Sequence, residues 1–414
     1  MAKKFASLFL ITVFVVGSLL FLAHPQEVSA QESAGMKSLK IGAIFPLSGP
    51  IAFTGIGALR GVEFAVKNIN EKGMPGRGPG ILVGNQRYKL EIVSYDDSAD
   101  PAKSVAGMRR LVELHKVPVI VGPFGTAMTW ACQEVNTQLG VLFNGMTQSD
   151  LSRRKGNTLF IQERVPTIYF GEPMAQACTE KGYKRACVVT DIVESYASHG
   201  KRFAQKFESL GGQVLAFQTV DVKHTTDFHS VMTSMKSKNP DVIFVAMVEE
   251  PLALATTHAL DVGYKGKFIF TSDWGSRAEK IIGLEKVVGA LVQVKLTAWW
   301  LKYPQEDKKG NYTALLKQFR QTYKEDPAVT FDSTYDPTWM FARAMEIANT
   351  VTDARAIRDA CPKAIQEGKL PLIFPRTDVL KNGLMVGCPD VLLEITKDGY
   401  NFVKELAVSR EVLE

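Results

Sequence analysis

Two consecutive series of alternating strands and helices constrain the fold of this 414-residue chain more than any other feature. In the first, apolar strand segments such as Leu39–Phe45 and Val117–Val121 alternate with helical segments such as Leu59–Ile69. The second series begins at about Pro166 and includes the strand segment Ala186–Thr190. Each strand–helix unit takes about 30 residues, the size of a βαβ crossover. The pattern predicts an α/β protein with two doubly wound lobes, each built on a parallel sheet covered by helices.

The rest of the chain, from Thr297 onward, is too short and too helical for a third lobe. Helical periodicity is found at Tyr312–Tyr323, Tyr335–Asn349 and Asp353–Glu367, and a terminal hairpin is predicted at 391–405. If these elements return to the two lobes, the chain crosses between the lobes more than once, which forms a hinge beside a closing cleft. We assign 39–164 with 297–388 to the first lobe, and 165–296 with 389–414 to the second.

Residues 1–30 have the features of a secretory signal peptide. Lys3 and Lys4 precede an apolar run at Phe5–Ala23, and Val28-Ser29-Ala30 supplies small residues for cleavage after Ala30. A membrane anchor is the alternative, because the run is long enough to span a bilayer. We expect an exported protein. Its net charge of +6 is mild and no block of like charge occurs, so nothing indicates a nucleic-acid partner.

Five cysteines, Cys132, Cys178, Cys187, Cys361 and Cys388, could form disulfides in an exported protein. The preferred pair is Cys361–Cys388, because both residues flank an irregular C-terminal stretch. Cys178–Cys187 is the second choice, since a helix end and the next strand could meet across a short loop. Cys132 lies in a predicted helix and is expected to be a buried thiol. None of the five has CxxC or metal-site spacing.

The segment VPVIVGPFGTAMT, Val117 to Thr129, predicts a buried strand, a tight turn at Gly122–Gly125 and a helix that begins near Thr126. The turn glycines allow the backbone to approach a ligand closely, and Thr126 is a good N-cap. A helix N-terminus favours an anion, and this turn lies at the carboxyl end of a strand, where ligands usually bind. The alternative is an ordinary strand–turn–helix connection with a capping threonine.

No motif for catalysis or for a cofactor stands out. Gly55, Gly57 and Gly61 have the spacing GxGxxxG instead of that of a dinucleotide fingerprint, and a turn into a helix explains them better. There is no GxSxG, HExxH or Walker A motif, and the six histidines are scattered. The acidic pairs Asp96-Asp97 and Glu249-Glu250 are read as loop caps or solvated surface. We therefore expect no enzymatic activity, no cofactor and no metal.

Polar and aromatic residues follow the strands of both predicted lobes, and loops after parallel strands share one edge of a sheet. In the first lobe these residues are Thr54, Phe124, Gly125, Thr126, Met146 and Thr147. In the second lobe they are Ser195, Tyr196, Glu249, Glu250, Asp273 and Trp274. The first set suits a carboxylate, and the second suits an ammonium or an aromatic group. A cleft between the two sets would suit a small zwitterion.

Four segments occur in order: LKIGAIFPLSGPIAFTGIGALRGVEFAVKNIN, YDDSADPAKSV, VPVIVGPFGTAMT and GVLFNGMTQSDLS. Together they resemble the periplasmic leucine/isoleucine/valine-binding protein family, which consists of type I solute-binding proteins of ABC transporters. The resemblance covers the mature chain, is strongest over Leu39–Leu151 and thins after about Thr297. It implies two α/β lobes with three hinge crossings, a ligand in the cleft between them and a membrane permease as partner.

The resemblance also implies roles for single residues by matched position. The ligand carboxylate would lie against Thr126 and the backbone of Phe124–Thr126, with further bonds from Thr147 and the backbone of Met146. Asp273 falls where the family places an acidic residue that takes the ligand's ammonium. Three more positions would form walls of the ligand cleft: Tyr196 matches a cleft tyrosine of the family, Thr54 replaces an aromatic residue, and Phe331 is a looser candidate.

Departures from the family pattern leave the ligand open. Ala99 and Gly125 stand where amino-acid-binding members of the family have a disulfide. Glu249-Glu250 stands where the family has a tyrosine and a neighbouring residue. We expect a small carboxylate-bearing solute, first a branched-chain or aromatic amino acid, that is delivered to an ABC transporter permease. The alternatives are a binder of aromatic carboxylates and a ligand-binding module of a sensory system. For a flatter ligand, the candidate walls are Trp130, Trp274, Phe124 and Met146.

Overall fold

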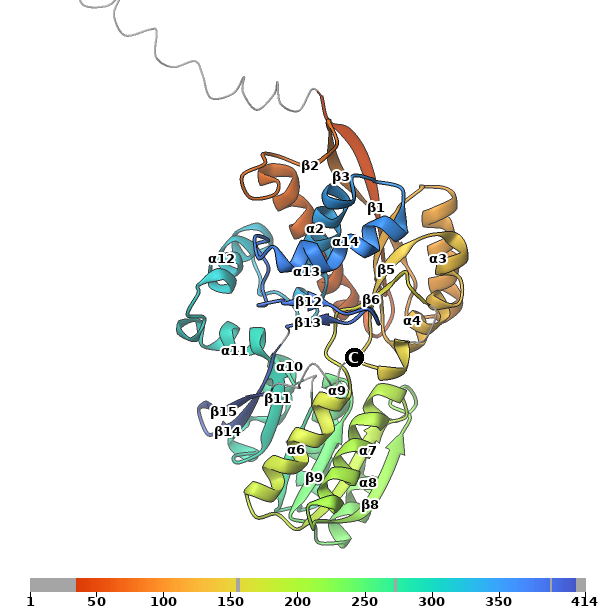
Figure 1. The fold of residues 1–414 in the computed structure, drawn as a ribbon. Helices are drawn as coiled ribbons and strands as arrows, with labels where there is room; N and C mark the ends of the chain where they lie inside the picture. Colours follow the sequence, from red (N-terminus) through yellow and green to blue (C-terminus); the bar gives the residue numbers. More distant parts are fainter. Residues whose placement is uncertain (1–34, 154–156, 272–273, 388, 407–414) are drawn as a thin grey trace, which may run out of the picture.

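The computed structural model describes residues 35–153, 157–271, 274–387 and 389–406. The chain forms two α/β lobes, shown one above the other in Figure 1, and each lobe is built on its own sheet. The strand order is β2-β3-β1-β4-β5-β6 in the first sheet and β15-β14-β11-β10-β9-β7-β8 in the second. The predicted fold of two doubly wound lobes is therefore confirmed.

The first lobe contains the N-terminal strands and helices together with helices from the last third of the chain. Its strands are β1 (Lys37–Phe45), β2 (Ile81–Val83), β3 (Gln86–Asp96), β4 (Val119–Phe124), β5 (Leu142–Met146) and β6 (Phe160–Gln162). Its helices are α2 (Ala52–Lys72), α3 (Pro101–Glu113), α4 (Thr126–Gln133), α5 (Asn136–Leu139), α12 (Asn311–Tyr323), α13 (Asp332–Ala348) and α14 (Ala354–Gln366). A short pair, β12 (Asp378–Val379) and β13 (Met385–Val386), follows α14.

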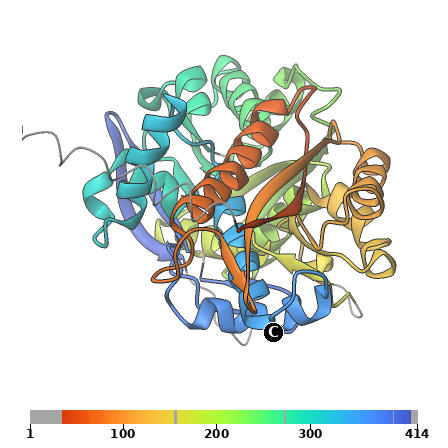
Figure 2. The ribbon, with the colours of Figure 1, turned by 90° about the horizontal axis from the view of Figure 1, so that it is seen from above.

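The side chains of β1 point alternately to the two faces of the sheet, and apolar side chains on both faces explain why helices cover both. Leu39, Ile41 and Phe45 belong to the core that includes α2 and α13, whereas Ile44 belongs to the core under α3. Figure 2 shows α2 and α3 on opposite sides of the strands. Asp100 caps α3 as its sequence predicts, since its carboxylate accepts the Lys103 amide at 2.8 Å.

The second lobe repeats this plan. Its strands are β7 (Arg185–Asp191), β8 (Gln213–Val220), β9 (Val242–Ala246), β10 (Lys267–Phe270), β11 (Leu291–Lys295), β14 (Asp390–Thr396) and β15 (Gly399–Leu406). Its helices are α6 (Ile168–Glu180), α7 (Glu194–Ser209), α8 (His229–Ser237), α9 (Glu249–Asp261), α10 (Ser276–Ile282) and α11 (Leu296–Lys302). The β14–β15 hairpin is confirmed, and it pairs antiparallel with β11. Within the described residues, no helix has the length and apolarity needed to cross a lipid bilayer.

Several expectations from the sequence are wrong in detail. The sheets are mixed and not purely parallel, because β2 and the β14–β15 hairpin run antiparallel to their neighbours. Gly125, with φ of 98°, is the N-cap of α4, so Thr126 is the first helical residue and not the cap. Thr54 and Tyr196 lie in the first turns of α2 and α7 and not in loops.

The expected disulfides do not form. Cys178, Cys187 and Cys361 are free buried thiols, which contradicts both the Cys178–Cys187 and the Cys361–Cys388 pairing; Cys388 itself lies outside the described residues. The Cys361 thiol donates to the Ile357 carbonyl at 3.4 Å. Cys132 is a buried thiol, as predicted, and burial raises its pKa to about 12, so it stays protonated and unreactive.

The glycines that resembled a dinucleotide fingerprint allow helix packing. A Cβ at Gly61 would lie 2.1 Å from the Thr334 hydroxyl, and one at Gly57 would lie 2.3 Å from the Ala328 Cβ. Helix α2 therefore packs closely against α13 and the segment before it. The expected turn into a helix is also wrong for these two glycines, since both lie inside α2.

Candidate functional site

The carboxyl ends of β4 and β5 bring two buried threonine hydroxyls together at the edge of the first lobe. Thr126 opens α4 directly after β4, and Thr147 follows β5; their Oγ1 atoms lie 3.1 Å apart. The Gly125 amide donates to the Met146 carbonyl at 3.0 Å, which holds the two strand ends in register. The Thr147 hydroxyl also accepts the Ser149 amide at 3.1 Å. This part of the site is fixed by short-range contacts between neighbouring parallel strands.

Arg164 is a buried cation beside this edge. It follows β6 in the first connection between the lobes, and only 7% of its surface is exposed. Its guanidinium carbon lies 5.9 Å from the centre of the Phe124 ring, within reach of a cation–π contact. Sequence reasoning missed Arg164; the available signal was a charged pair, Glu163-Arg164, at the end of the apolar stretch that forms β6.

The second lobe contributes aromatic side chains whose positions are fixed by other contacts. Trp274 stacks on Phe270 with ring centres 4.6 Å apart, and its indole N–H donates to the Tyr400 hydroxyl at 2.6 Å. Tyr196 is buried and makes an edge contact with the His199 ring at 5.7 Å. Burial and the nearby positive charges of Arg164 and Arg202 lower the pKa of His199 to about 3, so this imidazole is neutral and is no proton donor at ordinary pH.

The acidic pairs have the structural roles that the sequence suggested. Glu249 accepts the backbone amides of Arg277 and Ala278 at 2.9 and 3.0 Å and so caps α10. Glu250 pairs with the Arg277 guanidinium at 2.8 Å. Asp96, the last residue of β3, accepts the amide of Leu47 in the loop after β1 at 2.8 Å. Asp273, the residue expected to meet an ammonium, lies outside the described residues.

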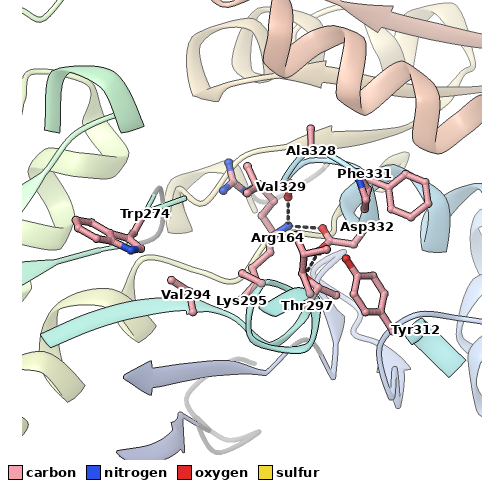
Figure 3. A pocket seen from close by; sticks show the side chains of 13 residues that line it. Arg164, Trp274, Val294, Lys295, Thr297, Tyr312, Ala328, Val329, Phe331 and Asp332 are labelled. Carbon is pink, nitrogen blue, oxygen red and sulfur yellow. Dashed lines mark hydrogen bonds and ion pairs between the residues drawn. The ribbon is translucent and has the colours of Figure 1, made fainter. Parts of the chain in front are cut away.

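A cavity between the lobes is lined by residues from both (Figure 3). Trp274 lies on one side of it, Phe331 and Asp332 lie on the other, and Arg164 and Lys295 lie between them. Its volume is about 40 Å³, enough for only a few water molecules. Of the residues expected in the ligand site, this cavity brings together Trp274 and Phe331, whereas Thr54, Phe124, Gly125, Thr126, Met146, Thr147, Tyr196 and Glu249 do not line it. Thr54 lies near its rim, since its carbonyl accepts the Thr330 hydroxyl at 2.9 Å.

Each of the three connections between the sheets carries a titratable residue, buried or partly buried, where a described strand ends or begins. These are Glu163 after β6 and Asp390 at the start of β14, both fully buried, and Lys295 at the end of β11, which is partly buried. The Lys295 ammonium donates to Asp332 at 2.5 Å and to the Ser333 hydroxyl at 2.6 Å. These bonds join the second connection to the start of α13, and Figure 3 draws the one between Lys295 and Asp332 as a dashed line.

Glu163 belongs to a fully buried charge cluster that we call the hinge triad, Glu163–Arg376–Asp336. The Arg376 guanidinium donates to Glu163 at 2.5 Å and to Asp336 at 3.2 Å, and all three side chains are inaccessible to solvent. Asp336 also accepts the Ile373 amide at 2.8 Å. Burial would raise the pKa of Glu163, but Arg376 and Lys295 outweigh it and hold that pKa below its usual value. Burial raises the pKa of Asp336 to about 6.

Asp390 gives the hinge a testable pH dependence. Burial raises its pKa to about 7, although Gln293, which donates to it at 2.8 Å, and Lys295 oppose the shift. An acid with a raised folded-state pKa stabilises the fold when protonated, and this contribution is lost as pH rises from about 4 through 7. Asp390→Asn should therefore stabilise the protein by more than about 1 kcal/mol at pH 8 and leave it unchanged at pH 4. Urea unfolding at the two pH values measures this; an equal effect at both would contradict the assignment.

Comparisons with known proteins agree with this architecture. A family model described as periplasmic binding protein matches residues 38–388. The chain is 24% identical over 376 residues to Leu/Ile/Val-binding protein homolog 7 of Brucella abortus, covering 84% of this chain and 86% of that protein. Two solved structures share the fold. The LivJ branched-chain amino acid transporter substrate-binding protein of Streptococcus pneumoniae, in complex with isoleucine, has a TM-score of 0.72 at 21% identity, covering 90% of this chain and 99% of that one.

The second structure is an ABC transporter solute-binding protein of R. palustris in complex with benzoate. It has a TM-score of 0.72 at 17% identity and covers 90% of this chain and 98% of that one. The family model spans most of the chain, and the first of these relatives is named for leucine, isoleucine and valine binding. The chain therefore belongs to the periplasmic binding protein family, in its type I form, to which the Leu/Ile/Val-binding proteins belong.

Proposed function

We propose that this protein captures a small carboxylate-bearing solute between its two lobes and delivers it to the permease of an ABC transporter, without chemical turnover. In this proposal residues 1–30 direct export to the periplasm and are removed after Ala30. The lobes are 39–164 with 297–388, and 165–296 with 389–414, and the protein acts as a monomer. The observation that carries the proposal is the buried pair of hydroxyls, Thr126 and Thr147, at the carboxyl ends of β4 and β5.

The first candidate ligand is an amino acid, branched-chain or aromatic. The carboxylate would accept bonds from Thr126, from Thr147 and from the backbone between Phe124 and Thr126, and Asp273 would take the ammonium. Tyr196, Met146 and Trp274 would form the walls, with Thr54 and Glu249 at the edges. Relatives support this choice, since one is named for leucine, isoleucine and valine and another was solved with isoleucine.

An aromatic carboxylate is the second candidate, and Arg164 is the observation that favours it. A buried guanidinium next to the Phe124 ring, in a cavity shared with Trp274, offers a charged partner for a carboxylate and flat surfaces for a ring. A relative solved with benzoate supports this choice. The cavity is too small for either ligand, so the lobes would have to separate for entry and close again over the solute.

A thermal-shift panel tests the proposal. The protein is mixed with α-amino acids, with benzoate-like acids and with aliphatic acids, and the melting temperature is measured. A ligand that binds only the native state raises this temperature. A shift with α-amino acids supports the first candidate, and a shift with aromatic acids alone supports the second. The absence of a shift with every carboxylate, from protein that was unfolded and refolded to remove any bound solute, would contradict solute capture and favour the sensory module.

Thr126→Ala should weaken binding of the ligand found in the panel by about 1–3 kcal/mol, because a buried carboxylate oxygen would lose a hydrogen-bond donor. Isothermal titration calorimetry measures the change. Thr256→Ala is the matched control: Thr256 is also a buried helical threonine, but its hydroxyl donates to the Leu252 carbonyl in α9. Equal affinities of Thr126→Ala and the unchanged protein would remove Thr126 from the site.

A further inference from the structure

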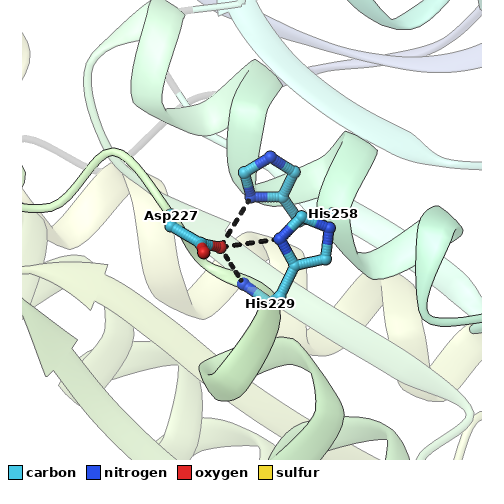
Figure 4. Close-up of side chains that lie close together, drawn as sticks. All are labelled: Asp227, His229 and His258. Carbon is cyan, nitrogen blue, oxygen red and sulfur yellow. Dashed lines mark hydrogen bonds and ion pairs between the residues drawn. The ribbon is translucent and has the colours of Figure 1, made fainter.

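Two histidines and an aspartate converge on the surface of the second lobe, away from the solute cavity (Figure 4). Asp227 and His229 flank Phe228 at the start of α8, and His258 lies in the last turn of α9. One ligand atom from each of the three side chains can be chosen so that all lie within 4.8 Å of one another. We call these residues the α8–α9 cluster.

The geometry of this cluster is compact. The two imidazole rings stack with centres 4.0 Å apart. The Asp227 carboxylate oxygen lies 2.6 Å from Nδ1 of His229 and 3.8 Å from Nδ1 of His258, so it faces both rings. The same oxygen accepts the backbone amide of His229 at 2.9 Å, which fixes the carboxylate at the start of the helix. Three donor groups are thus held in place by the ends of two packed helices.

We propose that the α8–α9 cluster binds one divalent transition-metal ion of the zinc, nickel or copper class. Two imidazole nitrogens and one carboxylate oxygen are the ligand set that these ions favour, whereas Mg²⁺ and Ca²⁺ prefer oxygen alone. Asp227 and His229 are exposed, so an ion can enter from solvent and keep water in its remaining positions. To bind, the ion replaces the direct contact between Asp227 and the His229 ring.

The surroundings of the two rings agree with this assignment. The carboxylate of Asp261 lies 3.7 Å from Nε2 of His229, where it can orient the ring while Nδ1 faces the ion. Nδ1 of His258 accepts the Phe228 amide at 3.0 Å, so this ring either gives up that bond or presents its other nitrogen to the ion.

The site is separate from solute capture. His258 is nine residues after Glu249, where α9 starts. At the rise of an α-helix this places the cluster about 14 Å along α9 from the edge that faces the cleft. The inference therefore does not depend on the proposed function, and either can fail while the other holds.

Titration calorimetry of the untagged protein with ZnCl₂ tests the site. We expect one ion per molecule and an affinity that survives excess MgCl₂. His229→Gln and Asp227→Asn should each weaken binding at least about tenfold, the scale found for supporting residues of metal sites; asparagine keeps the backbone cap, so its effect reports the lost charge. His224→Gln is the matched control, because His224 is an exposed histidine that lies 3.9 Å from Asp221. It should leave the affinity unchanged.

Two outcomes would overturn the proposal. One is the absence of saturable zinc binding by the unchanged protein. The other is an affinity in His229→Gln that equals that of the unchanged protein or of His224→Gln. The His229→Gln variant is used for this test because the His229 ring is half exposed and its removal leaves the core intact. His258 is less suitable, because its ring also accepts a hydrogen bond from the Phe228 amide. Melting curves without metal verify that each variant is folded.

Discussion

Replacing Arg376 with methionine should lower the free energy of unfolding by about 3–5 kcal/mol, the usual cost of leaving a buried charge without its partner. Arg376 is inaccessible to solvent and donates to two carboxylates that are themselves inaccessible, Glu163 and Asp336. Without the guanidinium, these acids would have to stay ionised in an apolar environment or take up protons. Urea unfolding at pH 7 measures the loss.

A control and a rescue sharpen this prediction. Arg109→Met removes an exposed ion pair with Glu113, whose charged atoms lie 3.9 Å apart, and should change stability by less than about 1 kcal/mol. The triple variant Glu163→Gln, Asp336→Asn, Arg376→Met removes all three charges and should recover part of the stability. A loss below 1 kcal/mol for Arg376→Met alone would mean that water reaches the hinge triad in solution.

The hinge triad also shows the limit of what could be predicted from the sequence. Glu163 and Arg376 lie 213 residues apart, and no local pattern links them. Elements with a strong period were predicted well, such as β1 with its alternating apolar residues and the helices α12 to α14. The short antiparallel strand β2 and the helices α10 and α11 were missed, because three to seven residues are too few for a period to show.

The candidate site, too, has a part that could be predicted from the sequence and a part that could not. The strand ends that carry Thr126 and Thr147 could be predicted, because parallel strands of a doubly wound sheet place their carboxyl ends together. The capping role of Thr126 was wrong because Gly125 reaches the positive φ that ends the turn, and the helix begins at Thr126, one residue earlier than a threonine cap requires. Arg164 was missed because its importance comes from the folding of both lobes around the first connection.

Arg164→Met should weaken binding of any carboxylate solute by about 2–5 kcal/mol, the range for removing one partner of a buried charge pair. Arg164 as a whole is 7% exposed and lines the cavity between Trp274 and Phe331, so a carboxylate there would be withdrawn from water and would depend on the guanidinium charge. Arg202→Met is the control. Arg202 forms an ion pair with Asp150 at 2.9 Å, and both residues line a different cavity, so this variant should leave the affinity unchanged. Calorimetry with the ligand found in the panel gives the values.

Asp273→Asn, measured beside Arg164→Met, separates the two candidate ligands. If the solute is an amino acid, both variants should lose affinity, because Arg164→Met removes a partner of the carboxylate and Asp273→Asn removes the partner of the ammonium. If the solute is an aromatic acid, Arg164→Met alone should lose affinity, since such a ligand has no ammonium for Asp273. Unchanged amino-acid binding in Asp273→Asn would remove the ammonium role, and unchanged binding of every carboxylate in Arg164→Met would leave the threonine pair as the anion site.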